Sequence, residues 1–484
     1  MRILSVSPEC FPLVKTGGLA DVVGALPGAL TPLGVEMRVV LPAYRGVREQ
    51  LTGVTRVATL SHGFGGDAHL LAGTIGQVQV LLVDAPHLFD RLGGPYLGPD
   101  GRDWPDNHRR FGALSRAAAD IALGHVTLPD GWRPDLLHLH DWQAALTAAY
   151  LRFDARSAQA PPTLLTIHNL AFQGVFPRAA AIELGLPSSA MLPDGAEYWG
   201  SLSFLKAGVQ WCDRITTVSP TYAREILTPE HGMGFDGLLR LRSADVTGIV
   251  NGLDTDVWDP AADTHVVAPY SSRRLHLKAE NKRALQAELG LQVRAESPLF
   301  CVVSRLTTQK GLDLLLDALD HVLWRGAQCA VLGTGDKDLE LAFRKAAHAR
   351  PSQIATVIGY DEALAHRLQA GADAIVVPSR FEPCGLTQLS GLRYGTVPIV
   401  SRVGGLADTV IDANEAALRD GVATGFVFSP VDTHQLGVAL DRACDVFFDR
   451  PQWQRLQRRA MTRDVGWHTA ATAYHELYDS LLHT

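Results

Sequence analysis

The sequence predicts an α/β protein with two doubly wound parallel sheets. Short apolar runs rich in β-branched residues alternate with helix-length amphipathic segments along almost all 484 residues. The runs are apolar on both faces, as parallel strands are when helices cover both sides of a sheet. This alternation is interrupted near residues 251–270, where Gly252, Pro260 and Pro269 fall in a stretch without periodicity. We interpret this stretch as the link between two sheets.

The candidate strands form one set on each side of this link. They are residues 2–7, 37–41, 78–84, 136–140, 163–167, 214–218 and 247–250, followed by 299–304, 328–332, 354–358, 374–377 and 398–401. Candidate helices lie between them, at 19–33, 109–123, 274–289, 312–325 and 361–370. A last helix over 469–482 carries one apolar stripe. Strand and helix in regular alternation predict doubly wound domains.

Composition excludes several classes of protein. The formal net charge is −7 and 46% of the residues are hydrophobic, which is ordinary for a globular chain. Mild acidity argues against a binder of nucleic acid or anionic membranes. There is no run of the roughly 20 apolar residues that a membrane helix needs, and no signal-peptide pattern at the start, so we expect a cytoplasmic protein. The six cysteines lack CxxC spacing, which leaves no sign of a zinc site or disulfide framework.

One five-residue string occurs twice, at Gly17–Asp21 and Gly404–Asp408. Each copy falls where a loop opens a helix. Glycine pairs suit such turns for conformational reasons alone. A second interpretation is that the two loops face each other and offer backbone N–H groups to an anion. Lys15 just before the first copy fits oxyanion binding, although neither the Walker A nor the GxGxxG spacing is present.

Two further segments follow strands of the second half. Arg305 and Lys310 come just after the strand 299–304, where parallel sheets bind ligands, and could neutralise a diphosphate. Glu382 lies ahead of a helix predicted to start near Leu386 and could accept bonds from sugar hydroxyls. Backbone amides at 385–387 could hold a phosphate. For Cys384, packing or a supporting role is favoured over a reactive thiol.

Histidines end two strands of the first half. His138 and His140 share one face of a strand, but a third metal ligand is missing, which makes zinc improbable. Asp141 and Trp142 at that strand end suit the binding of a sugar. For His168, at the end of the next strand, the expectation from position alone is a structural role. No GxSxG elbow supports a hydrolase.

These motifs together resemble the family of bacterial glycogen synthases and plant starch synthases. The resemblance runs through residues 15–22, 140–143, 166–174, 251–254, 304–311, 333–336, 358–360 and 378–410. It implies a GT-B fold: two Rossmann-like domains facing a central cleft, with a C-terminal helix crossing back to the first. The expected domains are 1–250 on the acceptor side, 251–465 on the nucleotide-sugar side, and the helix 466–484.

The resemblance also implies a reaction. The enzyme would transfer glucose from ADP-glucose to the non-reducing 4-hydroxyl of glycogen or another α-1,4-glucan. Configuration would be retained, and no metal or other cofactor would be needed. Alternatives are a UDP-glucose or other donor, or a catalytically silent protein that binds glucan or nucleotide. Loss of Arg305, Lys310 or Glu382 would mark the silent form, and all three are present.

Residue roles follow from the same resemblance. The expected catalytic residues are Arg305, Lys310, Glu382, His168 and Asp141, with the carbonyl of His168 stabilising positive charge at C1. The expected substrate-binding residues are Lys15, Gly18, Asp21, Asn169, Asn251, Tyr360, Cys384, Gly385, Leu386 and Thr387, with Tyr360 stacked on adenine. The chain departs at Ser390 from the wider GT-B pattern, which commonly has a second Glu at this position. The residue that contacts the ribose of the donor is therefore left unassigned.

Overall fold

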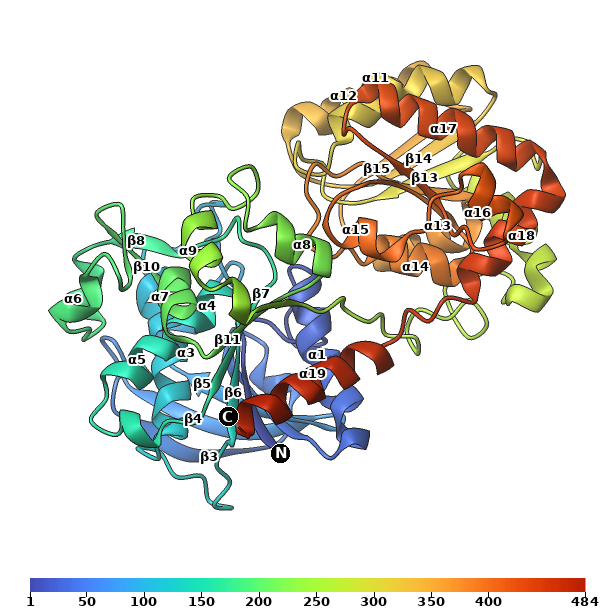
Figure 1. Cartoon of the computed structure of the whole chain (residues 1–484). Helices are drawn as coiled ribbons and strands as arrows, with labels where there is room; N and C mark the ends of the chain where they lie inside the picture. Colours follow the sequence, from blue (N-terminus) through green and yellow to red (C-terminus); the bar gives the residue numbers. More distant parts are fainter. Residues whose placement is uncertain (484) are drawn as a thin grey trace. The chain divides into compact units, whose positions relative to one another are not determined.

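The computed structural model describes residues 1–483, which form two compact units. The first comprises residues 1–251 and 467–483, and the second comprises residues 252–466. The chain therefore leaves the first unit, builds the second, and returns. Figure 1 shows this path by its colours, with the red C-terminal helix beside the blue N-terminal one. No helix among residues 1–483 is both long and apolar enough to cross a bilayer.

The first unit is built on a nine-stranded sheet, counted over residues 1–483. In spatial order its strands are β12 (Val246–Gly248), β11 (Arg214–Thr217), β7 (Thr163–Ile167), β6 (Leu136–His140), β1 (Arg2–Val6), β2 (Glu36–Pro42), β5 (Val78–Asp84), β4 (Ala68–Ile75) and β3 (Thr52–Leu60). Neighbouring strands from β12 to β5 are all parallel, as predicted. The strands β4 and β3 are antiparallel and were not predicted.

Helices cover both faces of this sheet. They are α1 (Gly18–Leu30), α2 (Pro86–Phe89), α3 (Asn107–Ala122), α4 (Asp141–Ala145), α5 (Thr147–Phe153), α6 (Ala180–Glu183), α7 (Phe204–Trp211), α8 (Pro220–Glu225), α9 (Asp236–Leu241) and α19 (His468–Leu482). Ile3 packs with α1 and α19, whereas its neighbour Leu4 packs with α3 on the opposite face. A small separate sheet is formed by β8 (Val175–Pro177), β10 (Ser201–Ser203) and β9 (Glu197–Tyr198).

The second unit contains a parallel sheet, six-stranded within the described chain. Its order is β15 (Ile354–Ile358), β14 (Gln328–Gly333), β13 (Leu299–Val303), β16 (Ala374–Val377), β17 (Val397–Ser401) and β18 (Phe426–Phe428). Its helices are α10 (Lys278–Glu288), α11 (Leu312–Trp324), α12 (Lys337–Ala349), α13 (Glu362–Gly371), α14 (Thr387–Tyr394), α15 (Gly404–Thr409), α16 (Glu415–Arg419), α17 (Thr433–Phe448) and α18 (Arg450–Met461). Phe300 and Cys301 of β13 belong to hydrophobic clusters on opposite faces, which confirms the doubly wound α/β class.

The predicted helix over 274–289 is wrong as a single element. Residues Ser272–Leu277 form a 3-10 helix with non-helical angles at Arg274, and the α-helix α10 begins only at Lys278. The helix predicted over 19–33 ends at Leu30 and continues as a 3-10 turn, because Pro32 cannot donate a helical hydrogen bond.

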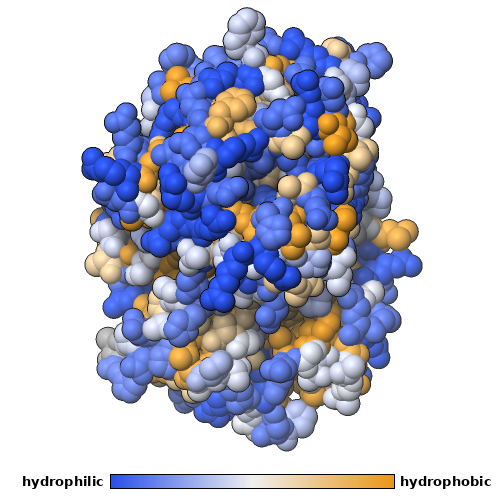
Figure 2. All heavy atoms as spheres, turned by 90° about the vertical axis from the view of Figure 1, so that its right-hand side faces the viewer, coloured by the Kyte–Doolittle hydropathy of each residue, from blue (hydrophilic) through white to orange (hydrophobic). Residues whose placement is uncertain are grey.

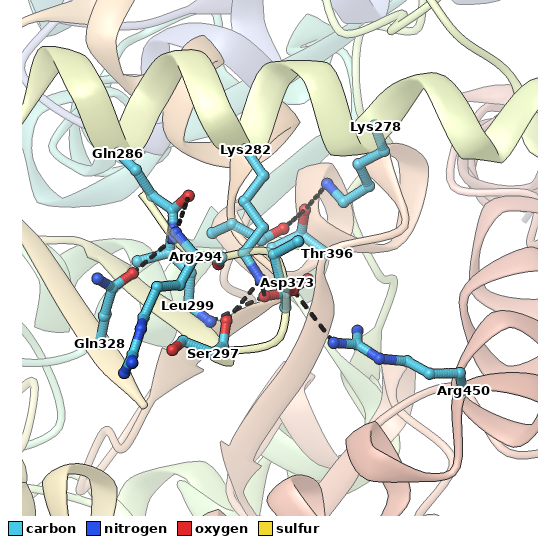
Figure 3. A network of polar contacts seen from close by, with 12 residues as sticks. Lys278, Lys282, Gln286, Arg294, Ser297, Leu299, Gln328, Asp373, Thr396 and Arg450 are labelled. Atoms are coloured by element: carbon cyan, nitrogen blue, oxygen red, sulfur yellow. Dashed lines mark hydrogen bonds and ion pairs between the residues drawn. The ribbon is translucent and has the colours of Figure 1, made fainter. Parts of the chain in front are cut away.

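Two buried lysines of α10 hold the second unit together. Figure 3 shows Lys278 and Lys282 pointing from this helix into the interior. The Lys278 ammonium donates to the carbonyls of Gln369 and Ala370 at 3.0 and 2.9 Å, near the carboxyl end of α13. Lys282 forms an ion pair of 2.7 Å with Asp373. Burial lowers the pKa of Lys278 to about 7. Both side-chain nitrogens therefore tie α10 to the end of α13 and to the residue that precedes β16.

Candidate functional site

A loop after β1 holds the first group of predicted site residues. The buried carboxylate of Glu9 accepts hydrogen bonds from the amide and hydroxyl of Thr16 and from the hydroxyl of Tyr96. This fixes the segment that presents Lys15, whose ammonium lies 2.9 Å from Asp21. The exposed Gly18 begins α1, and a side chain added at Gly17 would meet no atom within 4 Å. The loop therefore presents a cation and a helix N-terminus on an open surface.

Asp141 is held in an unusual conformation at the end of β6. Its φ of 56° is left-handed, a conformation that costs free energy for a residue with a side chain. The carboxylate is buried and accepts the amide of His168 at 2.7 Å. Burial raises the pKa of Asp141 to about 7, although the amides of His168 and Asn169 oppose this. The strained turn thus aims a carboxylate at the neighbouring strand end.

His168 is the end of a buried chain of hydrogen bonds. Its Nε2 lies 3.0 Å from Nδ1 of His140, and the second nitrogen of His140 lies 3.1 Å from the Ser5 hydroxyl. These three residues come from adjacent strand ends of the sheet. Burial lowers the pKa of His168 to about 3, so the ring is neutral at physiological pH. The structural role expected from the sequence and a role in holding the site are both compatible with this bonding.

Asn169 and Asn251 occupy two further positions in this unit. The side-chain oxygen of Asn169 accepts the amide of Ala171 at 3.0 Å, which shapes the turn after β7. Asn251 is 7% exposed, and its buried side-chain oxygen has no hydrogen-bond partner among the described residues. An unsatisfied buried acceptor is uncommon and is compatible with a ligand-binding position.

In the second unit, a close ion pair joins two predicted catalytic residues. The ammonium of Lys310 lies 2.5 Å from the carboxylate of Glu382, which is 6% exposed. The hydroxyl of Ser379 donates to the same carboxylate oxygen at 2.8 Å. Lys310 follows β13 and Glu382 follows β16, so the pair forms where two adjacent parallel strands end.

Arg305 lies on the same loop as Lys310 but is solvent-exposed. Its guanidinium is 3.4 Å from the side-chain oxygen of Gln309. Arg380, by contrast, is engaged in a two-pronged ion pair with Asp313 of α11 at 2.7 and 2.6 Å. The exposed Arg305 therefore has a guanidinium that can reach an anionic ligand, whereas Arg380 braces the loop.

The second glycine pair has a packing role. A side chain at Gly404 would come within 2.0 Å of the carbonyl oxygen of Glu382, and one at Gly405 within 2.2 Å of that of Cys384. The amide of Gly405 donates to the carbonyl of Glu382 at 3.1 Å. This pair thus lets α15 approach the loop that carries Glu382 closely.

The remaining predicted residues line the start of α14 and the end of β15. Cys384 is buried, Gly385 has a φ of 74°, Leu386 is the N-cap residue and Thr387 begins α14. Tyr360, after β15, is 76% exposed, and its hydroxyl donates to Glu362. No cluster of three or more His, Cys, Asp or Glu side chains suited to a metal ion occurs within residues 1–483.

Sequence reasoning missed the groups that support these residues. Glu9, Tyr96 and Ser379 each contact a predicted residue or its loop directly, and His140, weighed from the sequence only as a metal ligand, forms a hydrogen bond with His168. Glu9 follows the first strand, and that strand-end position was the available signal. Tyr96 lies in a loop with no periodic pattern, so nothing in the sequence marked it.

Comparison with known proteins places this architecture among glycosyltransferases. The starch synthase catalytic domain model matches residues 2–241, and the model named glycosyl transferases group 1 matches residues 290–446. A glycogen synthase of Roseobacter denitrificans is 54% identical over 482 residues, covering 100% of both chains. One from Mesorhizobium japonicum is 52% identical and covers 99% of that chain.

Comparison with solved structures also finds glycosyltransferases. The catalytic domain of starch synthase IV from Arabidopsis thaliana, bound to ADP and acarbose, superposes with a TM-score of 0.90 at 31% identity. The superposition covers 100% of this chain and 99% of that one. A sucrose-phosphate synthase from Thermosynechococcus elongatus shares the fold at 17% identity, with a TM-score of 0.59 and coverage of 100% and 99%.

Proposed function

Because the chain belongs to the glycogen synthase family, we propose that it transfers glucose from ADP-glucose to the non-reducing 4-hydroxyl of an α-1,4-glucan, with retention of configuration. Full-length identity to glycogen synthases at 52–54% carries this proposal. The Lys310–Glu382 pair at the carboxyl ends of β13 and β16 supports it, since a cation and a carboxylate there suit a sugar diphosphate. The ADP and acarbose of the starch synthase IV structure support a nucleotide and a glucan as ligands.

The residues of the second unit are assigned to the donor. Arg305 and Lys310 neutralise the diphosphate, and the amides of Gly385, Leu386 and Thr387 donate to it. Glu382 holds the hydroxyls of the donor glucose, Cys384 packs behind this loop, and Tyr360 stacks on adenine. The exposed ring of Tyr360 and the burial of Cys384 support these roles.

The first unit is assigned to the sugar and the acceptor. Asp141 and Asn169 contact sugar hydroxyls, and the carbonyl of His168 stabilises positive charge at C1. The polar loop after β1 contributes Lys15, the amide of Gly18 and Asp21 to substrate binding. The side-chain oxygen of Asn251 supplies a hydrogen-bond acceptor. The domain assignment that follows is 1–250 for the acceptor, 251–465 for the donor, and 466–484 as the helix that completes the first domain.

Electrostatic placement explains how such a site works. Glycosyl transfer develops positive charge at C1 and negative charge on the departing diphosphate. Preorganised donors are worth far more in a water-excluded site than in solution. Excluding water also prevents hydrolysis of the donor. Because Arg305 and Lys310 supply the positive charge, we expect turnover to persist in EDTA, and its loss on chelation would contradict this assignment.

The decisive assay incubates the purified chain with ADP-glucose and glycogen and measures released ADP. We expect ADP release that depends on the glucan and matches glucose incorporation. A second arm replaces ADP-glucose with UDP-glucose and tests the alternative donor by competition. No incorporation from any donor, with glycogen or nucleotide still bound, would favour the silent binding protein. A cytoplasmic location is part of the proposal, and fractionation of the native host would test it.

A further inference from the structure

Three polar residues of the first unit form a chain of hydrogen bonds that has a direction. The hydroxyl of Ser5 lies 3.1 Å from Nε2 of His140, and Nδ1 of His140 lies 3.0 Å from Nε2 of His168. Ser5 belongs to β1, His140 ends β6 and His168 follows β7, and these strands are neighbours in the sheet. Ser5 and His140 are only 1% and 0% exposed, so neither of them can touch a substrate. Any effect of these two residues on the reaction therefore passes through His168.

Both histidine rings of the chain are uncharged at neutral pH. Burial lowers the pKa of His168 to about 3. Burial also lowers the pKa of His140 well below its ordinary value, and the neighbouring His138 and His168 lower it further. A neutral imidazole carries one proton, so one of its ring nitrogens donates and the other accepts. Each ring therefore passes the direction of one hydrogen bond on to the next.

The chain can run in two directions, which leave one unpaired proton in different places. In the first, Ser5 donates to Nε2 of His140, Nδ1 of His140 donates to Nε2 of His168, and the proton of His168 is on Nδ1. In the second, His168 donates through Nε2, His140 donates to Ser5, and the hydroxyl proton of Ser5 needs a further acceptor. The bond to His140 is the one hydrogen bond that this hydroxyl forms within residues 1–483.

Burial selects the first direction. The reversed chain would leave the O–H of Ser5 without an acceptor in the interior, where an unpaired donor costs the full desolvation of that group. In the first direction the unpaired donor is Nδ1 of His168, which lacks a partner within the described residues but keeps contact with solvent. Water or a ligand can accept that proton. His168 thus presents a fixed N–H group to its surroundings.

We propose that Ser5 and His140 are positioning residues, whose hydrogen bonds hold the proton of His168 on Nδ1 so that this nitrogen donates to a hydroxyl group of the donor glucose. The inference rests on the proposed function, in which the carbonyl of His168 faces C1 of that glucose. The hydrogen bond of one ring nitrogen decides whether the other carries the proton. A sugar hydroxyl can donate or accept, so a fixed N–H decides which it does and aligns the sugar for reaction.

The direct test is the position of the proton on His168 in the wild-type chain. In protein labelled with ¹⁵N-histidine, long-range ¹H–¹⁵N correlation spectra distinguish a protonated ring nitrogen from an unprotonated one. The spectrum of His168→Gln identifies the signals that belong to His168. We expect the proton on Nδ1 in the wild type, and a population with the proton on Nε2 in Ser5→Ala. A wild-type proton on Nε2 would overturn the proposal.

Kinetic measurements test the consequence for the reaction. Ser5→Ala removes the hydroxyl, whereas Ser5→Thr keeps it on a residue type that suits a strand. Thr163→Val is the matched control, because it removes a buried hydroxyl from the opposite end of β7, where that hydroxyl donates to Asp213 at 2.8 Å. The quantities compared are kcat/KM for ADP-glucose, the Kd for ADP and the melting temperature.

Ser5→Ala should lower kcat/KM for ADP-glucose roughly two- to tenfold, the usual net effect of one neutral hydrogen bond. Its Kd for ADP should match the wild type, because ADP carries no glucose. Ser5→Thr and Thr163→Val should keep the wild-type kcat/KM, although Thr163→Val should melt at a lower temperature. An equal kinetic loss in Ser5→Thr or in Thr163→Val would contradict the role of the Ser5 hydroxyl. Absence of glucose transfer by the wild type would instead refute the proposed function, and the spectra would still test the direction of the chain.

Discussion

At the residue scale, the contact between Lys310 and Glu382 leads to the most specific prediction about activity. Lys310→Ala removes a cation assigned to the leaving diphosphate and leaves a buried carboxylate without its ion pair. Turnover should fall on the order of 10²- to 10³-fold, the usual effect of losing one oxyanion-stabilising group. Glu382→Ala should cost at least roughly tenfold, because it removes the carboxylate assigned to positioning the donor glucose through its hydroxyls. Steady-state ADP release measures both.

The matched control for this pair is Lys345→Ala, which removes an exposed lysine from α12. It should leave turnover near the wild-type value. Circular dichroism and melting curves establish that the active-site variants remain folded. Near-wild-type rates in a folded Lys310→Ala or Glu382→Ala variant would refute the assignment of the donor site.

The raised pKa of Asp141 leads to a prediction about how the stability of the protein depends on pH. Its folded-state pKa of about 7 lies above the ordinary value of 3.8, so the folded protein holds this proton more tightly than the unfolded chain. The associated stability is complete below about pH 4 and is lost as the pH rises through 7. Asparagine does not titrate. Asp141→Asn should therefore gain stability over wild type between pH 4 and pH 8, on the order of 2–4 kcal/mol.

Urea unfolding of wild type and Asp141→Asn at several pH values between 4 and 8 measures this difference. A gap between the two proteins that stays constant with pH would show that burial does not govern the Asp141 carboxylate. Activity is a separate readout, and the assignment of Asp141 to the sugar predicts that the variant is impaired at every pH.

At the element scale, α10 depends on the ion pair between Lys282 and Asp373. Both side chains are largely buried, at 7% and 12% exposure. Removing one partner of a buried pair typically costs about 3–5 kcal/mol because the other charge stays uncompensated. Lys282→Met should lower the free energy of unfolding of the second unit by that order. Chemical denaturation with a probe in the second unit measures it.

The exposed ion pair of Arg419 and Asp420 supplies the comparison, with side chains 78% and 62% exposed. Arg419→Met should change stability by less than about 1 kcal/mol, since water screens such pairs. Figure 2 shows one face of the molecule, on which hydrophilic side chains predominate over hydrophobic ones. Equal losses in Lys282→Met and Arg419→Met would contradict the role given to burial.

At the scale of the whole molecule, the last helix completes the first unit. Tyr474 and Tyr478 of α19 are fully buried against α1 and the sheet, and the Tyr478 hydroxyl lies 2.8 Å from Nδ1 of His138. Tyr478→Phe leaves that buried nitrogen without a partner, which should cost about 1–3 kcal/mol. Calorimetry should show the transition of the first unit moving down while that of the second unit stays in place. An equal shift of both transitions would contradict this.

Much of the site was predictable because parallel strands bring their carboxyl ends to one edge. Arg305, Lys310 and Glu382 were selected by position after a strand or before a helix, and Asp141 by position at a strand end, whereas the catalytic role of His168 followed only from the family resemblance. Their contacts were not predictable, because Lys310 and Glu382 are 72 residues apart and His140 and His168 are 28 apart. Such contacts depend on strand order and register, which local periodicity does not encode.

The sequence by itself determined the α/β class, the family, and twelve strands whose ends agree with the structure within two residues. Hydrophobic periodicity and turn residues act locally, so they can be recognised without the fold. Only the tertiary structure decided the antiparallel edge formed by β4 and β3. Most residues of β3 face the solvent at least in part, so its sequence lacks a clear alternation of apolar and polar residues. It also decided that Glu9 braces the loop that carries Lys15. Those arrangements arise from packing between distant segments, where burial and hydrogen-bond geometry, rather than local propensity, set the free energy.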